Sequence, residues 1–349
     1  MGENKIKKIV PYSFILSVFV TIIHNPVKAY YVYGNNTFGN LIHYLISDIL
    51  PCFTSIAVPS FFVFSAFLFY RTYSLDKTKK KLLSRFKSLV IPFILWNIIT
   101  LLIEMFTKIP AISRFSIDDS NPFIIENILK GIFLYKYNVF WFVFALILYN
   151  LFCPFVYRFL KNKIIGLFTI IVTCIVYIAF LSDKFYIAGS YFQWDSIIYY
   201  LIGAFIGIHY KSLLEIKTSK LNSFISIGIL FFCVFLECML SNLPIIIKIL
   251  ITLLKMIAFW CAFDLLDAKE SYPWWMSITF FIYASHNFIG RSWGTVFRFF
   301  ANRLFPIEFS ELIAFVFSLF ATIGTCILLA SVWKKVNLKS FNLFTGNRS

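Results

Sequence analysis

Long apolar runs alternate with short polar segments along almost the whole chain. Ten runs approach the length needed to span a membrane: 9–25, 49–70, 89–106, 139–157, 164–182, 195–209, 221–240, 244–265, 276–292 and 309–333. A transmembrane helix needs about 20 apolar residues, and at such lengths only helices satisfy their own backbone hydrogen bonds in lipid. The pattern predicts an all-α, polytopic transmembrane helix bundle of about ten spans. Because the longest intervening segment, 107–138, is too short for a soluble domain, we expect one integral-membrane domain over residues 1–349.

Composition points to the same class of protein. Hydrophobic residues make up 60% of the chain and charged residues only 14%, whereas a soluble domain carries about a quarter charged residues. The 45 phenylalanines, 19 tyrosines and 8 tryptophans suit lipid-facing helices with aromatic side chains at the membrane interfaces. We therefore expect membrane lipids to surround most of the protein.

The lysines and arginines predict the orientation of the chain. If the N-terminus lies in the cytoplasm, cytoplasmic segments hold 21 of the 32 basic residues, external segments hold nine, and Lys248 and Lys255 fall within a run. This bias follows the positive-inside rule and predicts that both termini are cytoplasmic. We therefore attribute the net charge of +16 to the lysines and arginines that orient the chain in the membrane. The sequence contains no nucleic-acid-binding module and no glycine-rich phosphate loop, so we expect no nucleic-acid partner.

The first run ends in a histidine. Residues 9–24 read IVPYSFILSVFVTIIH, with three lysines in front of them. An ionisable side chain at membrane depth is costly, and imidazole takes and returns a proton near neutral pH, so His24 is a candidate functional residue. Two alternatives are open. His24 merely caps the span at the interface, or the run is a signal peptide cleaved near residues 27–29, which removes His24 and leaves nine spans.

A second histidine lies in the ninth run. His286 follows Trp275 by 11 positions, which places it near the middle of the membrane by helical rise. Tyr283 and Ser285 are close enough along the chain to hydrogen-bond the ring. The alternative role for His286 is a hydrogen bond that holds neighbouring helices together, as polar side chains often do in membrane bundles.

Segment 71–88 is more basic than orientation requires. It contains seven lysines and arginines, among them Arg71, Arg85 and Lys87, against one acidic residue. Such a segment holds anionic lipid headgroups or docks a phosphorylated cytosolic ligand, for which Arg supplies bidentate contacts and Lys point charge. Arg85 and Lys87 lie at the mouth of the third span and are the better candidates for a ligand.

Other polar residues favour structural roles. Glu237 ends the seventh run and Lys248 begins the eighth, so antiparallel helices are expected to pair them. Segment 293–305 has apolar residues at helical spacing, which predicts an interfacial helix, or a surface that steers an anionic acceptor. The seven cysteines show no C-x-x-C spacing and the four histidines no i,i+4 pair, so we expect neither a disulfide framework nor a metal site.

Six elements, in this order, resemble the acyltransferase-3 family of bacterial integral-membrane O-acyltransferases. They are the first span ending in His24, VPSFFVFSAFLF at 58–69, RFKSLVIPFILWN at 85–97, FWF at 140–142, YYLIGAFIGI at 199–208, and I-Y-x-x-H at Ile282, Tyr283 and His286. The resemblance implies transfer of an acyl group, with acetyl expected, from acyl-coenzyme A (acyl-CoA) to a hydroxyl of a cell-envelope or lipid-linked glycan. It also implies a location in the bacterial inner membrane.

The resemblance assigns roles to particular residues. His24 and His286 are the expected catalytic residues, with His24 as general base on the acceptor hydroxyl or as transient acyl carrier. The expected substrate-binding residues are Arg71, Arg85, Lys87, Asn97, Trp141 and Tyr283. The basic residues among them are assigned to the phosphates of CoA, and the others position the substrate. No metal and no cofactor besides the acyl donor is implied.

The chain departs from the family pattern at three places. Ser13 stands where many members carry arginine, Ala66 where glycine is usual, and residues 143–145 where relatives often have Arg-Asp. Either another cation such as Arg71 replaces the missing arginine, or catalysis is weakened. Two rival functions stay open: a transporter or flippase of glycan intermediates or small metabolites, and a non-catalytic relative that binds a glycan or lipid. The sequence assigns no acceptor identity and no oligomeric state.

Overall fold

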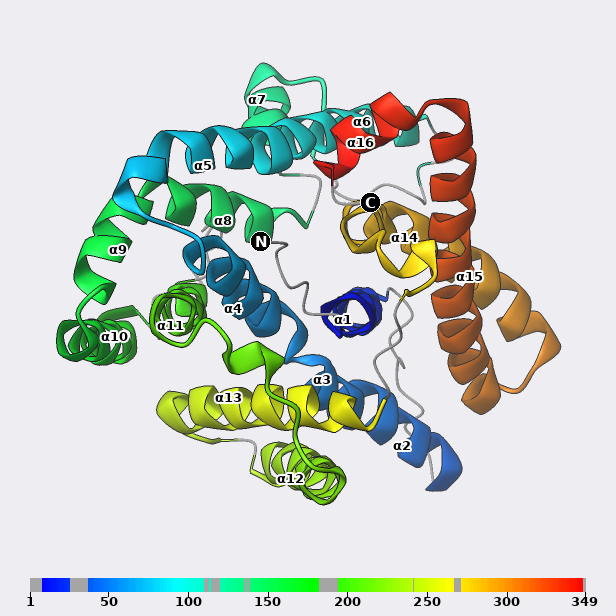
Figure 1. Ribbon diagram of the computed structural model, residues 1–349. Coiled ribbons are helices and arrows are strands. Elements are labelled where there is room, and N and C mark those ends of the chain that lie inside the picture. The colour runs from blue at the N-terminus through cyan, green and yellow to red at the C-terminus, as the bar shows by residue number, and fades with distance from the viewer. Residues whose placement is uncertain are drawn as a thin grey trace. The chain divides into compact units, whose positions relative to one another are not determined.

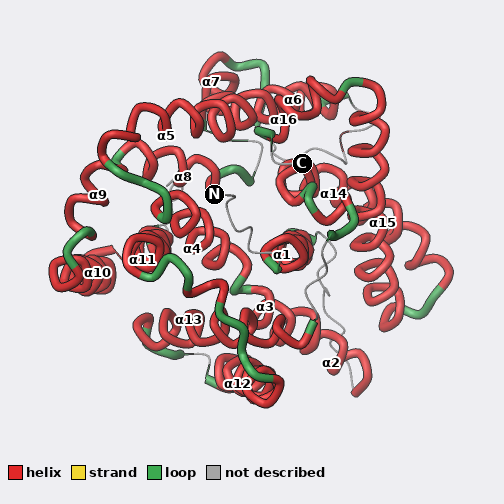
Figure 2. The backbone as a smooth tube through the Cα atoms, viewed as in Figure 1, coloured by secondary structure: helices red, strands yellow, loops and turns green. Residues whose placement is uncertain are grey.

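The computed structural model describes residues 8–25, 37–109, 113, 120–134, 136, 139–181, 194–240, 242–266 and 271–347. Within these residues every regular element is a helix, and Figure 2 shows helices joined by loops and turns. The prediction of an all-α fold is therefore confirmed.

Six helical segments of the described chain are long and apolar enough to cross a membrane: Gly39–Tyr70, Leu75–Thr107, Lys163–Phe180, Lys220–Met239, Ile245–Leu265 and Phe309–Val336. Helices α8 (Trp141–Leu151) and α9 (Cys153–Leu160) are bent by 68° against each other and make a seventh if they form one span. All seven coincide with expected runs, so the chain is an integral membrane protein.

The other three expected runs form less typical spans. Two of them are the shorter apolar helices α1 (Ile9–Ile23) and α11 (Asp195–His209), and the third is the first part of the more polar α14 (Thr279–Leu304). The total of ten spans and the cytoplasmic position of both termini therefore stay predictions.

The chain forms two compact units, which we describe separately. The first unit contains Met1–Leu16, Ser55–Phe86 and Ala145–Pro273, and the second contains Ser17–Thr54, Lys87–Phe144 and Trp274–Ser349. Helices α1 and α8 run from one unit into the other. The expectation of a single domain over residues 1–349 stays a prediction.

In the first unit, close packing of two helices depends on glycine. Besides α9, α11 and its parts of α1 and α8, this unit contains α4 (Ala57–Tyr70), η2 (Leu75–Lys77), α5 (Thr78–Arg85), α10 (Lys163–Val176), η5 (Tyr177–Leu181), η6 (Leu213–Glu215), α12 (Lys220–Met239), α13 (Ile245–Ala262) and η7 (Phe263–Leu265). A Cβ atom at Gly203 of α11 would collide with the backbone of Val63 on α4, and one at Gly207 would lie 2.6 Å from the carbonyl oxygen of Phe67. This G-x-x-x-G spacing lets the two backbones approach each other closely.

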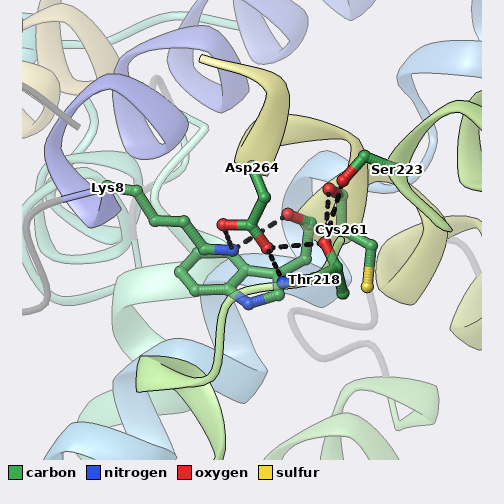
Figure 3. A network of polar contacts seen from close by, with 6 residues as sticks. Lys8, Thr218, Ser223, Cys261 and Asp264 are labelled. Carbon is green, nitrogen blue, oxygen red and sulfur yellow. Dashed lines mark hydrogen bonds and ion pairs between the residues drawn. The ribbon is translucent and has the colours of Figure 1, made fainter. Parts of the chain in front are cut away.

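An ion pair holds the start of α1 within the first unit. The Lys8 ammonium lies 2.7 Å from the Asp264 carboxylate, which also accepts hydrogen bonds from the backbone N–H and the hydroxyl of Thr218 (Figure 3). Lys8 also donates to the carbonyl oxygen of Trp260 at 3.2 Å. Burial lowers the pKa of Lys8, although Asp264 opposes this shift. The network ties the residue before α1 to η7 and to the segment that precedes α12.

A second ion pair corrects a prediction. Glu237 of α12 pairs with Lys255 of α13, and not with Lys248, and Lys255 also donates to the hydroxyl of Ser55 at 2.8 Å. Lys248 and Lys255 are seven residues apart, so they lie on nearly the same face of α13. The predicted partner was therefore wrong: the Lys255 side chain is fully buried, whereas Lys248, one level away along α13, is exposed.

The second unit contains the C-terminal helices. Its other elements are α2 (Thr37–Tyr44), η1 (Leu45–Ile49), α3 (Leu50–Thr54), most of η3 (Phe86–Val90), α6 (Ile91–Thr107), α7 (Ile125–Phe133), η8 (Trp274–Met276), α15 (Ile307–Val336) and α16 (Leu338–Thr345). Helices α14 and α15 pack along each other (Figure 1). The helix expected at 293–305 is present up to Leu304, but it is the continuation of α14 and not a separate helix. Its position at the membrane interface stays a prediction. The helix can continue through polar residues because its backbone hydrogen bonds do not require an apolar sequence. One of these polar residues, Arg298, forms an ion pair with Glu311 of α15 at 3.7 Å.

Candidate active site

His24 lies at the end of α1, in the second unit. Its backbone N–H donates to the carbonyl oxygen of Val20 at 3.1 Å, which continues the helical hydrogen bonding for one more residue. The side chain is half-buried. The apolar run that begins at residue 9 therefore forms a helix, and the His24 imidazole lies directly after its last residue.

His286 lies inside α14 and is almost completely buried, with 2% of its surface exposed. Its Nδ1 atom lies 2.7 Å from the carbonyl oxygen of Tyr283 and 3.2 Å from that of Ile282. A carbonyl oxygen only accepts hydrogen bonds, so Nδ1 carries the proton and Nε2 of the neutral ring is an acceptor. This Nε2 atom is buried and has no hydrogen-bond partner in the described part of the chain. Such an atom is costly to leave unsatisfied, which points to a group that arrives with a ligand.

The two histidine rings are in contact. Their centroids lie 5.3 Å apart with an interplanar angle of 47°, although the residues are far apart in the sequence. Two positive charges at this separation would repel each other by roughly 3 kcal/mol at an effective dielectric constant of about 20. The pair therefore disfavours double protonation, which keeps at least one neutral imidazole able to accept a proton.

The predicted hydrogen bonds from Tyr283 and Ser285 side chains to His286 are wrong. The Tyr283 hydroxyl donates to the carbonyl oxygen of Val139 at 2.6 Å, and its ring stacks on Phe140. The Ser285 hydroxyl donates to the carbonyl oxygen of Phe281 at 2.7 Å. Within a helix, the carbonyls three and four residues back are nearer to the imidazole than these hydroxyls are, so the backbone holds the ring.

Asn97 is a predicted site residue on α6 and is also buried, with 1% of its surface exposed. Its Nδ2 atom donates to the carbonyl oxygen of Ile132 at 2.9 Å, whereas its Oδ1 atom is buried without a partner among the described residues. The adjacent Trp96 packs on Phe281 and Phe288, which lie before and after His286 on α14. Asn97 thus offers a second unsatisfied acceptor on a helix that contacts the His286 segment.

Trp141, also a predicted site residue, begins α8 and is half-buried. The hydrogen bond between Tyr283 and Val139 holds the segment just before Trp141 to α14. This contact connects the FWF and I-Y-x-x-H elements of the sequence within the second unit.

The predicted basic residues have partners of their own. In the first unit, Arg71 forms an ion pair with Glu215, and the Arg85 guanidinium lies 5.2 Å from the ring centroid of Phe69. In the second unit, Lys87 is exposed in the π-helical segment η3. The carboxylate partner of Arg71 was not anticipated, because Glu215 lies in a different loop of the sequence.

A polar contact beside His24 was not predicted from the sequence. Asn25, next to His24, is hydrogen-bonded to Ser318 of α15. Ser318 is one of several serines and threonines in the apolar helix α15, so the sequence alone does not single it out. Within the described residues, no group of three or more His, Cys, Asp or Glu side chains is placed to hold a metal ion.

These observations define an all-α integral membrane protein in which two histidines meet beside a buried, unsatisfied nitrogen. A family model described as an acyltransferase domain matches residues 4–331 of the 349. The chain therefore belongs to the acyltransferase-3 family and is a membrane acyltransferase, as the sequence resemblance implied. No curated protein and no solved structure matches the chain.

Proposed function

We propose that the protein transfers an acyl group, acetyl in the first instance, from acyl-CoA to a hydroxyl of a cell-envelope or lipid-linked glycan. The observation that supports the site most directly is the contact between His24 and His286, with the buried Nε2 atom of His286 left without a partner. We further propose that the protein acts in the bacterial inner membrane with both termini in the cytoplasm, as the distribution of lysine and arginine predicts.

In the proposed reaction, His24 is the general base. The acceptor oxygen attacks the thioester carbonyl carbon while its proton passes to the His24 imidazole. The tetrahedral intermediate then collapses, the carbon–sulfur bond breaks, and the His24 imidazolium returns the proton to the leaving thiolate. The products are the O-acyl ester and free CoA. A positioned base contributes about 10²–10⁴-fold to the rate of such a step.

His286 has a different role in this proposal. Its Nδ1–H is used by the backbone, so only Nε2 is free to interact with substrate, and only as an acceptor. We assign to it a hydrogen bond from a hydroxyl or amide of the bound substrate. Asn97 Oδ1 is the second acceptor of the same kind, and Tyr283 and Trp141 shape the surrounding surface.

The phosphates of CoA are assigned to the basic residues after α4. Arg85 and Lys87 are the first choice, since Arg71 already has the Glu215 carboxylate as its partner. An arginine that binds phosphate contributes a charge-assisted hydrogen bond, which is stronger than a neutral one.

The test uses the purified full-length protein in lipid nanodiscs with radiolabelled acetyl-CoA, and membranes of a deletion strain as the source of acceptor. The proposal predicts base-labile label in the membrane fraction with the wild type and none with His24→Ala. Equal labelling with both proteins would mean that His24 is not needed for acyl transfer. Absence of labelling together with lost glycan export on gene deletion would favour the transporter instead.

A further inference from the structure

We propose that Asn25 and Ser318 form a clamp that positions the His24 imidazole beside His286. The inference rests on the proposed function, because it assigns these two residues to the placement of the general base. Neither residue touches the reacting atoms in this account, so both are positioning residues.

The clamp is a set of short polar contacts between the end of α1 and α15. Asn25 Nδ2 lies 3.2 Å from the carbonyl oxygen of Phe315 and 3.2 Å from Ser318 Oγ. Ser318 Oγ in turn lies 2.9 Å from the Phe315 carbonyl oxygen and 3.3 Å from Asn25 Oδ1. Both N–H groups of the amide thus find an acceptor. Both residues are buried, so water does not compete for these hydrogen bonds.

The position of Asn25 in the chain gives the clamp its effect on His24. Asn25 directly follows His24, and its own backbone N–H donates to the carbonyl oxygen of Ile22 at 3.1 Å. The backbone of His24 is therefore held from both sides, by the last turn of α1 before it and by the clamped amide after it. The clamp therefore fixes the backbone position from which the His24 ring reaches His286.

The clamp also connects the two histidines through one rigid pair of helices. His286 lies on α14, which packs along α15. Ser318 lies on the same α15. Fixing Asn25 to Ser318 therefore fixes His24 relative to the helix pair that carries His286. Misplacement of a catalytic group by about 1 Å can reduce a rate by about 100-fold.

The test compares three variants that break the clamp with one matched control. Asn25→Ala, Ser318→Ala and the double variant remove it. Thr325→Val is the control: it removes the hydrogen bond that Thr325 of the same helix α15 accepts from Trp293 Nε1 at 2.9 Å, and Thr325 takes no part in the clamp. For each full-length protein in nanodiscs, kcat and KM for acetyl-CoA are measured with deletion-strain membranes as acceptor, together with the thermal unfolding midpoint.

We expect kcat to fall by about 10–100-fold in each single clamp variant, while KM for acetyl-CoA changes less than about twofold. The double variant should lose no more than Asn25→Ala alone, because that change already removes the contact between Asn25 and Ser318. Thr325→Val should keep kcat within about twofold. If Asn25→Ala fails to fold, Ser318→Ala, which leaves the amide–carbonyl contact in place, still decides the result.

Two results would overturn the clamp. The first is a kcat within twofold of the wild type in both single variants, while His24→Ala is inactive. The second is an equal loss of kcat in Thr325→Val, which would mean that any weakening of α15 has the same effect. Activity that is unchanged in His24→Ala would instead contradict the proposed function, so the two failures are distinguishable.

Discussion

Two ion pairs of the first unit and one histidine of the second show two different ways of burying an ionisable side chain. In the first unit, Lys8 is paired with Asp264, and Lys255 is paired with Glu237 and hydrogen-bonded to Ser55. In the second unit, His286 Nε2 is equally buried but has no partner within the described residues. Paired charges stabilise the arrangement of helices. An unsatisfied acceptor stabilises nothing by itself, and its cost is offset only when a ligand supplies the missing donor.

This comparison separates structural from functional polar residues more clearly than depth in the membrane does. Both sets are buried, and both are ionisable. Only the state of their hydrogen bonds differs, so mutations in the two sets should affect different measured quantities: stability in the first unit and acyl transfer in the second.

The largest effect on stability is expected for Glu237→Gln. The change removes the Glu237 carboxylate from the Lys255 ammonium, whose side chain is fully buried. The cost of an uncompensated buried charge is about 3–5 kcal/mol of unfolding free energy. Unfolding in detergent titrations should report this loss, and Glu237→Gln combined with Lys255→Met should recover part of it. A loss below 1 kcal/mol would mean that the pair is not structural.

His286→Phe should show the reverse pattern. The phenyl ring preserves much of the packing but removes both nitrogens, so acyl transfer should fall by about 100-fold, in line with the loss of a substrate hydrogen bond in the transition state. The unfolding midpoint should change little, because the variant also removes an unsatisfied buried acceptor. The labelling assay and thermal unfolding measure the two quantities. A destabilised variant with normal transfer per folded molecule would place His286 with the structural residues.

Arg85→Ala sharpens the comparison for the acyl donor. If Arg85 binds a phosphate of CoA, KM for acetyl-CoA should rise by about tenfold while kcat is retained, since a charge-assisted hydrogen bond contributes about 1.5–3 kcal/mol. Arg71→Ala is the matched control from the same segment, because Arg71 already pairs with Glu215. An unchanged KM in Arg85→Ala would return segment 71–88 to a role in binding lipid headgroups.

The smallest effect is expected for Lys248→Met. This lysine lies on the same face of α13 as Lys255 but is exposed. Its replacement should change the unfolding free energy by less than about 0.5 kcal/mol, as surface substitutions usually do. The detergent titration used for Glu237→Gln serves here as well. A loss of unfolding free energy as large as that of Glu237→Gln would instead support the ion pair between Glu237 and Lys248 that the sequence pattern predicted.

The helical fold and most long spans follow directly from the length and apolarity of the runs. The pattern did not predict the ends of helices that continue through polar residues. The apolar run ends at residue 292, but α14 continues past Arg298 to Leu304. The partner of Glu237 was misplaced because seven residues separate two lysines on one face, and the pattern specifies a face but not a level.

For the candidate site, the sequence singled out His24 and His286 individually. Their contact depends on where the end of α1 lies relative to α14, which no local pattern encodes. The hydrogen bonds of the site were harder still to predict. His286 bonds to backbone carbonyls, and Asn25 bonds to a serine almost 300 positions away. Side-chain identity alone does not reveal such partners.

The most direct test of the account is mass spectrometry of envelope glycans from cells with the intact gene, a deleted gene, or His24→Ala. The account predicts a base-labile ester, with the mass of one acetyl group, that is present only with the intact gene. Identical ester content in all three strains, with the protein correctly expressed in the membrane, would contradict it.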